Sequence, residues 1–324
     1  MGYGALVRIA QSLLTLLAMS VLVFVAIYLI GNPIELLVPP QANQAEMARA
    51  AQALGLDQPL PVQYLHFLGQ ALKGDLGRSF TSNAPALTVI FERMPATLEL
   101  ALAAALIAVG LGIPLGLWSA FADGHPASRA TLGLATLGFS MPTFWIALLL
   151  VMVFSVQLEW LPSGGRDASA TLLGWRTSLA SWQGLAHLAM PACSLALFKL
   201  ALIIRVTYAA TIDTLRLDHV RQARARGLSP ARILWAHVLK NIGAPLLNVI
   251  GLEFGALVAF SVVTETVFAW PGMGRLLIDA INTLDRPVIV AYLLLTVVLF
   301  TLINLAVDIA CLAIDPRLRE ARGR

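Results

Sequence analysis

The chain has 324 residues, of which 58% are hydrophobic and only 12% are charged, and its mean hydropathy is +0.80. A soluble domain carries about twice that share of charge, so the composition excludes a soluble globular protein and predicts several membrane spans. The formal net charge of +4 gathers in a few loops and not on a face interleaved with aromatic side chains, which argues against a nucleic-acid partner.

The first predicted element is a membrane span close to the N-terminus. Residues 9–30 are apolar and follow Arg8, and this run is longer than the about 7–15 residues of a signal-peptide core. No small-residue cleavage site precedes the Gly-Asn-Pro sequence at 31–33. We therefore expect a retained span at 9–31, in a first unit of residues 1–31.

Five further windows are predicted to cross the membrane. Each is rich in Leu, Ala, Val and Ile and provides the about 20 helical residues that span the hydrocarbon, while charges, Pro and Gly gather between the windows. The sequence therefore predicts an all-α membrane protein with six transmembrane helices. The five windows are 95–121, 131–158, 186–211, 242–267 and 287–312.

The linking segments predict which side of the membrane each loop occupies. Lys and Arg are denser in the segments on the side of the N-terminus than in those on the other side. By the positive-inside rule, both termini are then cytoplasmic. Residues 32–94 form an extracytoplasmic segment with short amphipathic helices at 44–54 and 62–72, and residues 313–324 form a cytoplasmic tail.

Motifs for catalysis and for metal binding are missing from the sequence. It has no HExxH, CxxC or GxSxG, and no GxxxxGK[ST] loop with which to bind and hydrolyse ATP. Cys193 and Cys311 stand alone in apolar stretches, and the five histidines lack the spacing of metal ligands. We predict no catalytic residue, no metal site and no enzymatic activity.

Ionisable residues inside the predicted spans are candidates for function. Each costs about 2.5–3.5 kcal/mol at a helix centre, so each should face a partner or a water-filled cavity. Glu253 and Asp308 lie deepest, and with Met141 and Glu265 we count them as candidates for lining a transport path. Structural ion pairing is an equally good interpretation. The ionisable residues are Glu99, Lys199, Arg205, Glu253, Glu265 and Asp308.

Small residues and prolines mark particular points in the spans. Gly112 and Gly116 form a small-xxx-small pattern, which permits close contact between helices. The Met-Pro pairs at 141–142 and 190–191 predict a kink or a helix start, and a gate is the less favoured interpretation.

The cytoplasmic loop at 212–241 is predicted to be a helical hairpin. Residues 218–226 form a short basic helix, and Gly227 is suited to end it because glycine adopts positive φ without strain. The Ser-Pro pair at 229–230 provides the N-cap and first residue of a second helix over 231–240. Such a hairpin is a docking element for another protein. The alternative is a basic loop that binds lipid headgroups, which needs no glycine turn.

At this loop the sequence resembles the permease subunits of bacterial ABC importers of the dipeptide, oligopeptide and nickel group. The general importer motif begins with Glu-Ala-Ala and closes with Ile-x-Leu-Pro. This chain has Arg221 and Lys240 at the glutamate and proline positions, which is typical of the peptide group. Further segments that match these permeases are 55–60, 74–79, 95–100, 265–274 and 315–317.

The resemblance implies a type I ABC importer permease fold, with a permease core at 95–312 and a periplasmic segment at 32–94. It also implies that the hairpin couples this core to ATPases. The residues to which it assigns this role are Asp218, Arg221, Ala223, Arg224, Ala225, Gly227, Ser229 and Pro230.

The resemblance further implies the partners of a peptide importer in the bacterial inner membrane. A second, homologous permease would complete the path, two cytoplasmic ATPases would carry ATP and Mg, and a periplasmic binding protein would deliver the substrate. This chain would bind no cofactor itself. Nickel or another small solute is the alternative substrate. An ion-driven secondary transporter that uses Glu253 and Asp308, or a membrane scaffold without transport, is the alternative class.

Overall fold

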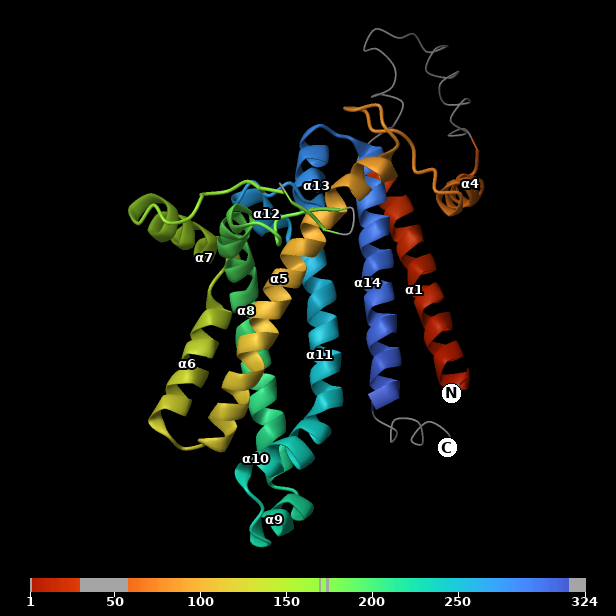
Figure 1. Ribbon diagram of the computed structural model, residues 1–324. Helices are drawn as coiled ribbons and strands as arrows, with labels where there is room; N and C mark the ends of the chain where they lie inside the picture. The colour runs from red at the N-terminus through yellow and green to blue at the C-terminus, as the bar shows by residue number, and fades with distance from the viewer. Residues whose placement is uncertain (1, 30–57, 169, 173–174, 315–324) are drawn as a thin grey trace, which may run out of the picture.

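The computed structural model describes residues 2–29, 58–168, 170–172 and 175–314. These residues form a bundle of long helices that stand side by side, with short helices and loops at both ends (Figure 1). Five helices in the described part are long and apolar enough to cross a membrane. The predicted helix at 44–54, and residues 315–324 of the predicted tail, lie outside the described residues.

Four of the predicted spans coincide with long helices. These helices are α1 (Gly2–Leu29), α5 (Ala86–Phe121), α8 (Trp182–Leu215) and α14 (Arg286–Ile314). α5 begins before its predicted window, so residues 86–94 are helical although we assigned them to the extracytoplasmic segment. Pro191 lies inside α8 without ending it, so the kink or helix start expected at 190–191 does not break the helix.

The predicted third span at 131–158 is not one straight helix. It consists of α6 (Pro126–Ser140), α7 (Thr143–Leu150) and the π-helix η1 (Val151–Gln157). The part after α6 turns away by 103°. Pro142 explains the break, because proline disfavours helical backbone in the residue before it, and Met141 is extended with φ −88° and ψ 135°. Pro142 is the N-cap of α7, which confirms the expected helix start. The number of spans reaches six if this bent pair counts as one.

The predicted fifth span also differs at its end. The observed elements are α11 (Leu239–Phe260), α12 (Val262–Val267) and α13 (Met273–Asn282). The helix therefore ends at Phe260, short of the predicted residue 267. α12 and α13 lie at one end of the bundle with α4 (Leu60–Leu72), the second of the amphipathic helices that we predicted.

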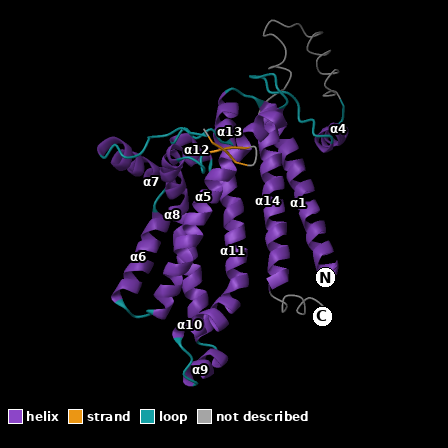
Figure 2. Ribbon diagram, viewed as in Figure 1, coloured by secondary structure: helices purple, strands orange, loops and turns teal. Residues whose placement is uncertain are grey.

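A two-stranded β-hairpin lies at this same end of the bundle (Figure 2). β1 (Ala170–Leu172) pairs antiparallel with β2 (Trp175–Thr177), with Thr171 opposite Arg176. α1 begins and α14 ends at the opposite end of the bundle, and an ion pair of 2.6 Å joins Arg8 to Asp308 between these two helices.

The centre of the fold is the contact between α5 and α8. Gly112 and Gly116 face α8 there, and a Cβ built on Gly116 would lie 2.6 Å from Thr207 Cβ and 2.8 Å from the Ile204 carbonyl oxygen. Only a residue without a side chain permits this approach, which confirms the close helix contact expected from the small-xxx-small pattern. Ala104 and Ala108 of α5 and Ala196 of α8 are fully buried.

Leucine in place of Gly116 is expected to destabilise the permease core strongly, because the new side chain forces α5 away from α8. Overpacking of this kind costs about 1–3 kcal/mol or more. The apparent unfolding temperature of the purified chain in detergent measures the effect. Gly110→Leu is the matched control on the same helix, since a Cβ there meets no atom within 4 Å. Equal unfolding temperatures for the two variants would contradict the assigned packing.

Candidate functional site

A helical hairpin projects from the end of the bundle where α8 meets α11 (Figure 1). Its elements are α9 (Asp218–Ala225), α10 (Pro230–Ile233) and the π-helix η2 (Leu234–Val238). α9 ends in a Schellman motif, in which the Leu228 N–H donates to the Ala223 carbonyl at 3.2 Å and the Gly227 N–H donates to the Arg224 carbonyl at 3.0 Å. Gly227 has φ +77°, the conformation for which glycine was expected at this position.

The second arm of the hairpin is longer than predicted. The Ser229 hydroxyl accepts a hydrogen bond from the Arg232 N–H at 3.4 Å, and Pro230 is the first helical residue. The helix does not end at residue 240 as expected, because α10 and η2 continue into α11 and together form one apolar helical stretch over Pro230–Phe260. The second arm of the hairpin is therefore continuous with a candidate membrane span.

Buried apolar side chains fix the hairpin on the bundle. Val220 of α9 is fully buried against Ile233 and Val238 of the second arm, which makes the hairpin stiff. Ala223 belongs to this packed face, since it is only 7% exposed, so it is not available for docking. The other seven residues assigned to coupling are exposed. They are Asp218, Arg221, Arg224, Ala225, Gly227, Ser229 and Pro230.

One exposed aromatic residue of the hairpin was missed by the sequence reasoning. Trp235 is 73% exposed and lies on η2, three residues after Arg232 in the sequence. An exposed tryptophan is a frequent anchor in protein interfaces. Its occurrence in a charged loop, away from the apolar windows, was the signal that could have identified it.

Two of the candidate path residues form ion pairs between spans. Asp308 of α14 pairs with Arg8 of α1, and Glu253 of α11 pairs with Lys199 of α8. A third pair joins Glu99 of α5 to Arg166 at 2.5 Å. This third pair fixes the loop before β1 to the first half of α5. The alternative of structural ion pairing therefore describes Asp308 well, because its partner is on the outermost helix and not on the polar face described below.

Glu265 does not face a path in this structure, because it has no exposed surface. Its carboxylate accepts hydrogen bonds from Thr97 Oγ1 at 2.7 Å, Ser261 Oγ at 2.9 Å and the Arg275 N–H at 3.0 Å. These bonds join α12 to the start of α13 and to α5. Glu265 is thus a structural anchor, which corrects its place among the lining candidates. Met141 is 39% exposed at the bend after α6.

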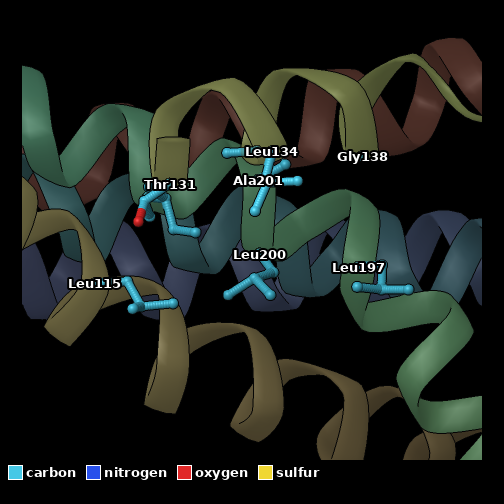
Figure 3. A pocket seen from close by; sticks show the side chains of 9 residues that line it. Leu115, Thr131, Leu134, Gly138, Leu197, Leu200 and Ala201 are labelled. Carbon is cyan, nitrogen blue, oxygen red and sulfur yellow. The ribbon is translucent and has the colours of Figure 1, made fainter. Parts of the chain in front are cut away.

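Both sides of the contact between α6 and α8 have a groove lined mainly by apolar side chains, and only one of the two grooves holds a charged residue. On the side of α5, a groove of about 360 Å³ is lined by apolar side chains, and Figure 3 shows Leu115, Leu134 and Leu200 around it. Its one hydroxyl, that of Thr131, donates to the Ala127 carbonyl at 3.0 Å. This groove suits hydrocarbon. On the other side, a groove of about 640 Å³ contains the exposed guanidinium of Arg205.

A second exposed surface lies on α11. An exposed stripe runs down this helix at intervals of three or four residues from Asn241 to Leu252, with Phe260 eight residues further on, and α5, α8 and α14 cover its other faces. Asn248 lies in the stripe, although an amide exposed to lipid inside a span is unfavourable. We call the larger groove and this stripe the polar face, after Arg205, Asn241 and Asn248, although apolar side chains make up most of it. The exposed stripe residues that define it on α11 are Asn241, Pro245, Asn248, Leu252 and Phe260.

Comparison with known proteins identifies the family. The family described as the binding-protein-dependent transport system inner membrane component matches residues 112–320, and the N-terminal part of the membrane component of such systems matches residues 4–101. The chain belongs to this family of inner-membrane transport components. A solved inward-facing structure of the MetNI methionine ABC transporter matches with a TM-score of 0.55 and 18% identity, over 70% of this chain and 96% of that chain. This likeness confirms the fold expected for an ABC importer permease.

Curated relatives cover the permease almost from end to end. The di/tripeptide transport system permease protein DppB of Pseudomonas aeruginosa (strain UCBPP-PA14) is 39% identical over 97% of this chain and 98% of its own. The dipeptide transport system permease protein DppB of Escherichia coli (strain K12) is 35% identical over 97% and 98%. The glutathione transport system permease protein GsiC of Salmonella typhi is 38% identical over 94% and 95%.

Proposed function

We propose that this permease forms part of the path of an ATP-driven importer for di- and tripeptides. The substrate assignment rests on the relatives, which are named for di/tripeptides, dipeptides and glutathione and match over nearly the whole chain. A periplasmic binding protein delivers the peptide, and both termini of the permease are cytoplasmic. ATP and Mg are bound by two partner ATPases and no cofactor is bound by this chain.

Coupling rests on the continuity of the hairpin with α11. The exposed residues around Gly227 dock on an ATPase, and closure of the ATPase pair displaces the hairpin. Because one helical stretch runs over Pro230–Phe260, this displacement reaches the middle of the membrane without being absorbed by a flexible linker. A rigid connection of this kind is required if the ATPases are to open and close the transport path from a distance.

The polar face supports the position of the path. A second, homologous permease covers this face, and the peptide passes between the two chains where Asn248 and Arg205 provide polar contacts. The apolar groove beside Leu115 (Figure 3) faces lipid instead. An ion-driven mechanism receives less support, since the deep acids Glu253 and Asp308 each have a basic partner.

Uptake by the reconstituted complex tests this function. The permease is assembled in proteoliposomes with a candidate second permease, two ATPases and a binding protein, and a labelled dipeptide is supplied on the side of the binding protein. We expect uptake that requires ATP hydrolysis and stops with a non-hydrolysable analogue. Uptake driven by an ion gradient without ATP would exclude the importer assignment. ATP-driven uptake of Ni²⁺, with none of peptide, would exclude only the substrate.

A further inference from the structure

The ion pair between Lys199 and Glu253 lies deep in the membrane. α8 has 34 residues and Lys199 is near its middle, about 25 Å from either end at 1.5 Å per residue. The two side chains remain 14% and 22% exposed, whereas the structural anchor Glu265 is fully buried. A molecule in the path can therefore reach this pair.

Stability alone is a weak reason for such a pair. Replacing a buried ion pair by apolar residues of similar volume is often neutral or stabilising, because the pair must first lose its hydration. Ionisable residues inside spans instead mark the routes of polar substrates. The pair joins α8, which lines the larger groove of the polar face, to α11, which carries its stripe.

The pair is one end of a row of charged and aromatic side chains across three helices. Lys199 Nζ lies 5.2 Å from the centre of the Phe198 ring, and Phe198 stacks on Phe139 of α6 with 4.4 Å between ring centres. The Arg205 guanidinium lies 5.7 Å from the Phe139 ring. Among the described residues, Arg205 has no carboxylate within ion-pair distance. We call these residues, from Glu253 to Arg205, the charged row.

The charged row has the groups that a short peptide requires. A di- or tripeptide carries an ammonium at one end, a carboxylate at the other, and side chains of any kind between them. The row has an acid at one end, an unpaired guanidinium at the other and two aromatic faces between. Guanidinium groups bind carboxylates with two parallel hydrogen bonds, and aromatic faces accept varied apolar side chains.

We propose that the charged row is a contact site for peptides inside the transport path. Glu253 accepts the peptide ammonium, which takes the place of the Lys199 ammonium, and Arg205 binds the peptide carboxylate. The rings of Phe198 and Phe139 contact the side chains. This inference rests on the proposed function and adds to it a position where the permease itself recognises both ends of the substrate.

Paired neutral variants of the reconstituted complex test the proposal. In the row variant, Lys199→Met is combined with Glu253→Gln, and Arg205→Gln is made separately. The matched control is Arg8→Met with Asp308→Asn, which neutralises another ion pair between two spans, away from the polar face. Uptake of a labelled dipeptide, basal ATPase activity and the yield of assembled complex are measured for each.

We expect both row variants to lower dipeptide uptake at least tenfold while assembly and basal ATPase activity stay near those of the wild type. The control pair should change uptake less than twofold. Equal losses in row and control variants, or normal uptake in both row variants, would overturn the proposal. Should the neutral double variant fail to assemble, Lys199→Glu with Glu253→Lys keeps an ion pair and decides the question, because normal uptake by this reversed pair would also overturn it.

The wild-type complex separates this proposal from the proposed function. If the wild type takes up no peptide, the substrate assignment fails and the row proposal fails with it. If the wild type takes up peptide and the row variants do so equally well, the proposed function stands and only the contact site is excluded.

Discussion

Valine in place of Gly227 is expected to uncouple the permease from its ATPases. The residue has φ +77°, which costs a residue with a side chain about 1–2 kcal/mol and a β-branched one more. A Cβ there meets no atom within 4 Å, so the strain acts on the turn itself and not through a clash. Since 1–2 kcal/mol corresponds to about a 5–30-fold change in population, we expect peptide-stimulated ATP hydrolysis to fall by about tenfold.

Co-purification with the ATPases and stimulated hydrolysis in proteoliposomes measure this effect. Gly243→Ala is the control, because Gly243 lies within α11, also meets no atom within 4 Å, and alanine favours a helix by about 0.5–1 kcal/mol. Gly227→Asn should be milder than valine, since asparagine tolerates positive φ. If the valine variant binds the ATPases and stimulates hydrolysis like the wild type, the hairpin is not the coupling element.

The hairpin was predictable because its signals are local. Gly227 ends α9 and the Ser-Pro pair at 229–230 starts α10, and each of these residues acts on its own backbone. The same holds for Pro142 as a helix start. The Met-Pro pair at 141–142 predicted a kink or a helix start at this point, but the size of the bend, 103°, was not predictable. The hydropathy of the window at 131–158 is that of a straight span and contains no information about direction.

The partners of the buried charges could not be read from the sequence. Arg8 and Asp308 are 300 positions apart, and Glu99 and Arg166 are 67 apart, so that only the packing of the helices brings each pair together. For the same reason Glu265 was taken as a path candidate. Its position inside a predicted span indicated that the carboxylate needs a partner to offset its desolvation. The partners are hydroxyl and backbone groups, which cannot be recognised in the sequence by their charge.

Glu265 is the residue outside the hairpin whose loss is expected to have the largest effect. Its carboxylate accepts from the Arg275 N–H, which belongs to the first turn of α13 and has no partner within that helix. Thr97 is part of the same network, since its hydroxyl donates to Glu265 and accepts from the Met273 N–H at 2.8 Å. One side chain therefore satisfies and orients groups on α5, α12 and α13.

Alanine at position 265 leaves the Arg275 N–H and the Thr97 hydroxyl without their acceptor, whereas the Ser261 hydroxyl keeps the Val258 carbonyl at 3.2 Å. Each such group costs about 1–3 kcal/mol, so we expect a loss of about 3–5 kcal/mol, seen as a fall of about 10 °C or more in the apparent unfolding temperature in detergent. The unfolding temperature of Glu265→Gln should fall less than that of the alanine variant, because the amide oxygen still accepts a hydrogen bond. It should still fall below that of the wild type, because the amide NH₂ group faces donors.

The matched control for this loss is Glu92→Ala, at an exposed glutamate of α5, which should change stability by no more than about 0.5 kcal/mol. If the Glu265→Ala and Glu92→Ala variants unfold at the same temperature, the network around Glu265 does not hold α13 in place. If instead only the Glu265→Ala variant is unstable, and the fraction of it that assembles still imports peptide, then the carboxylate supports the fold. It then takes no direct part in transport, as its burial indicates.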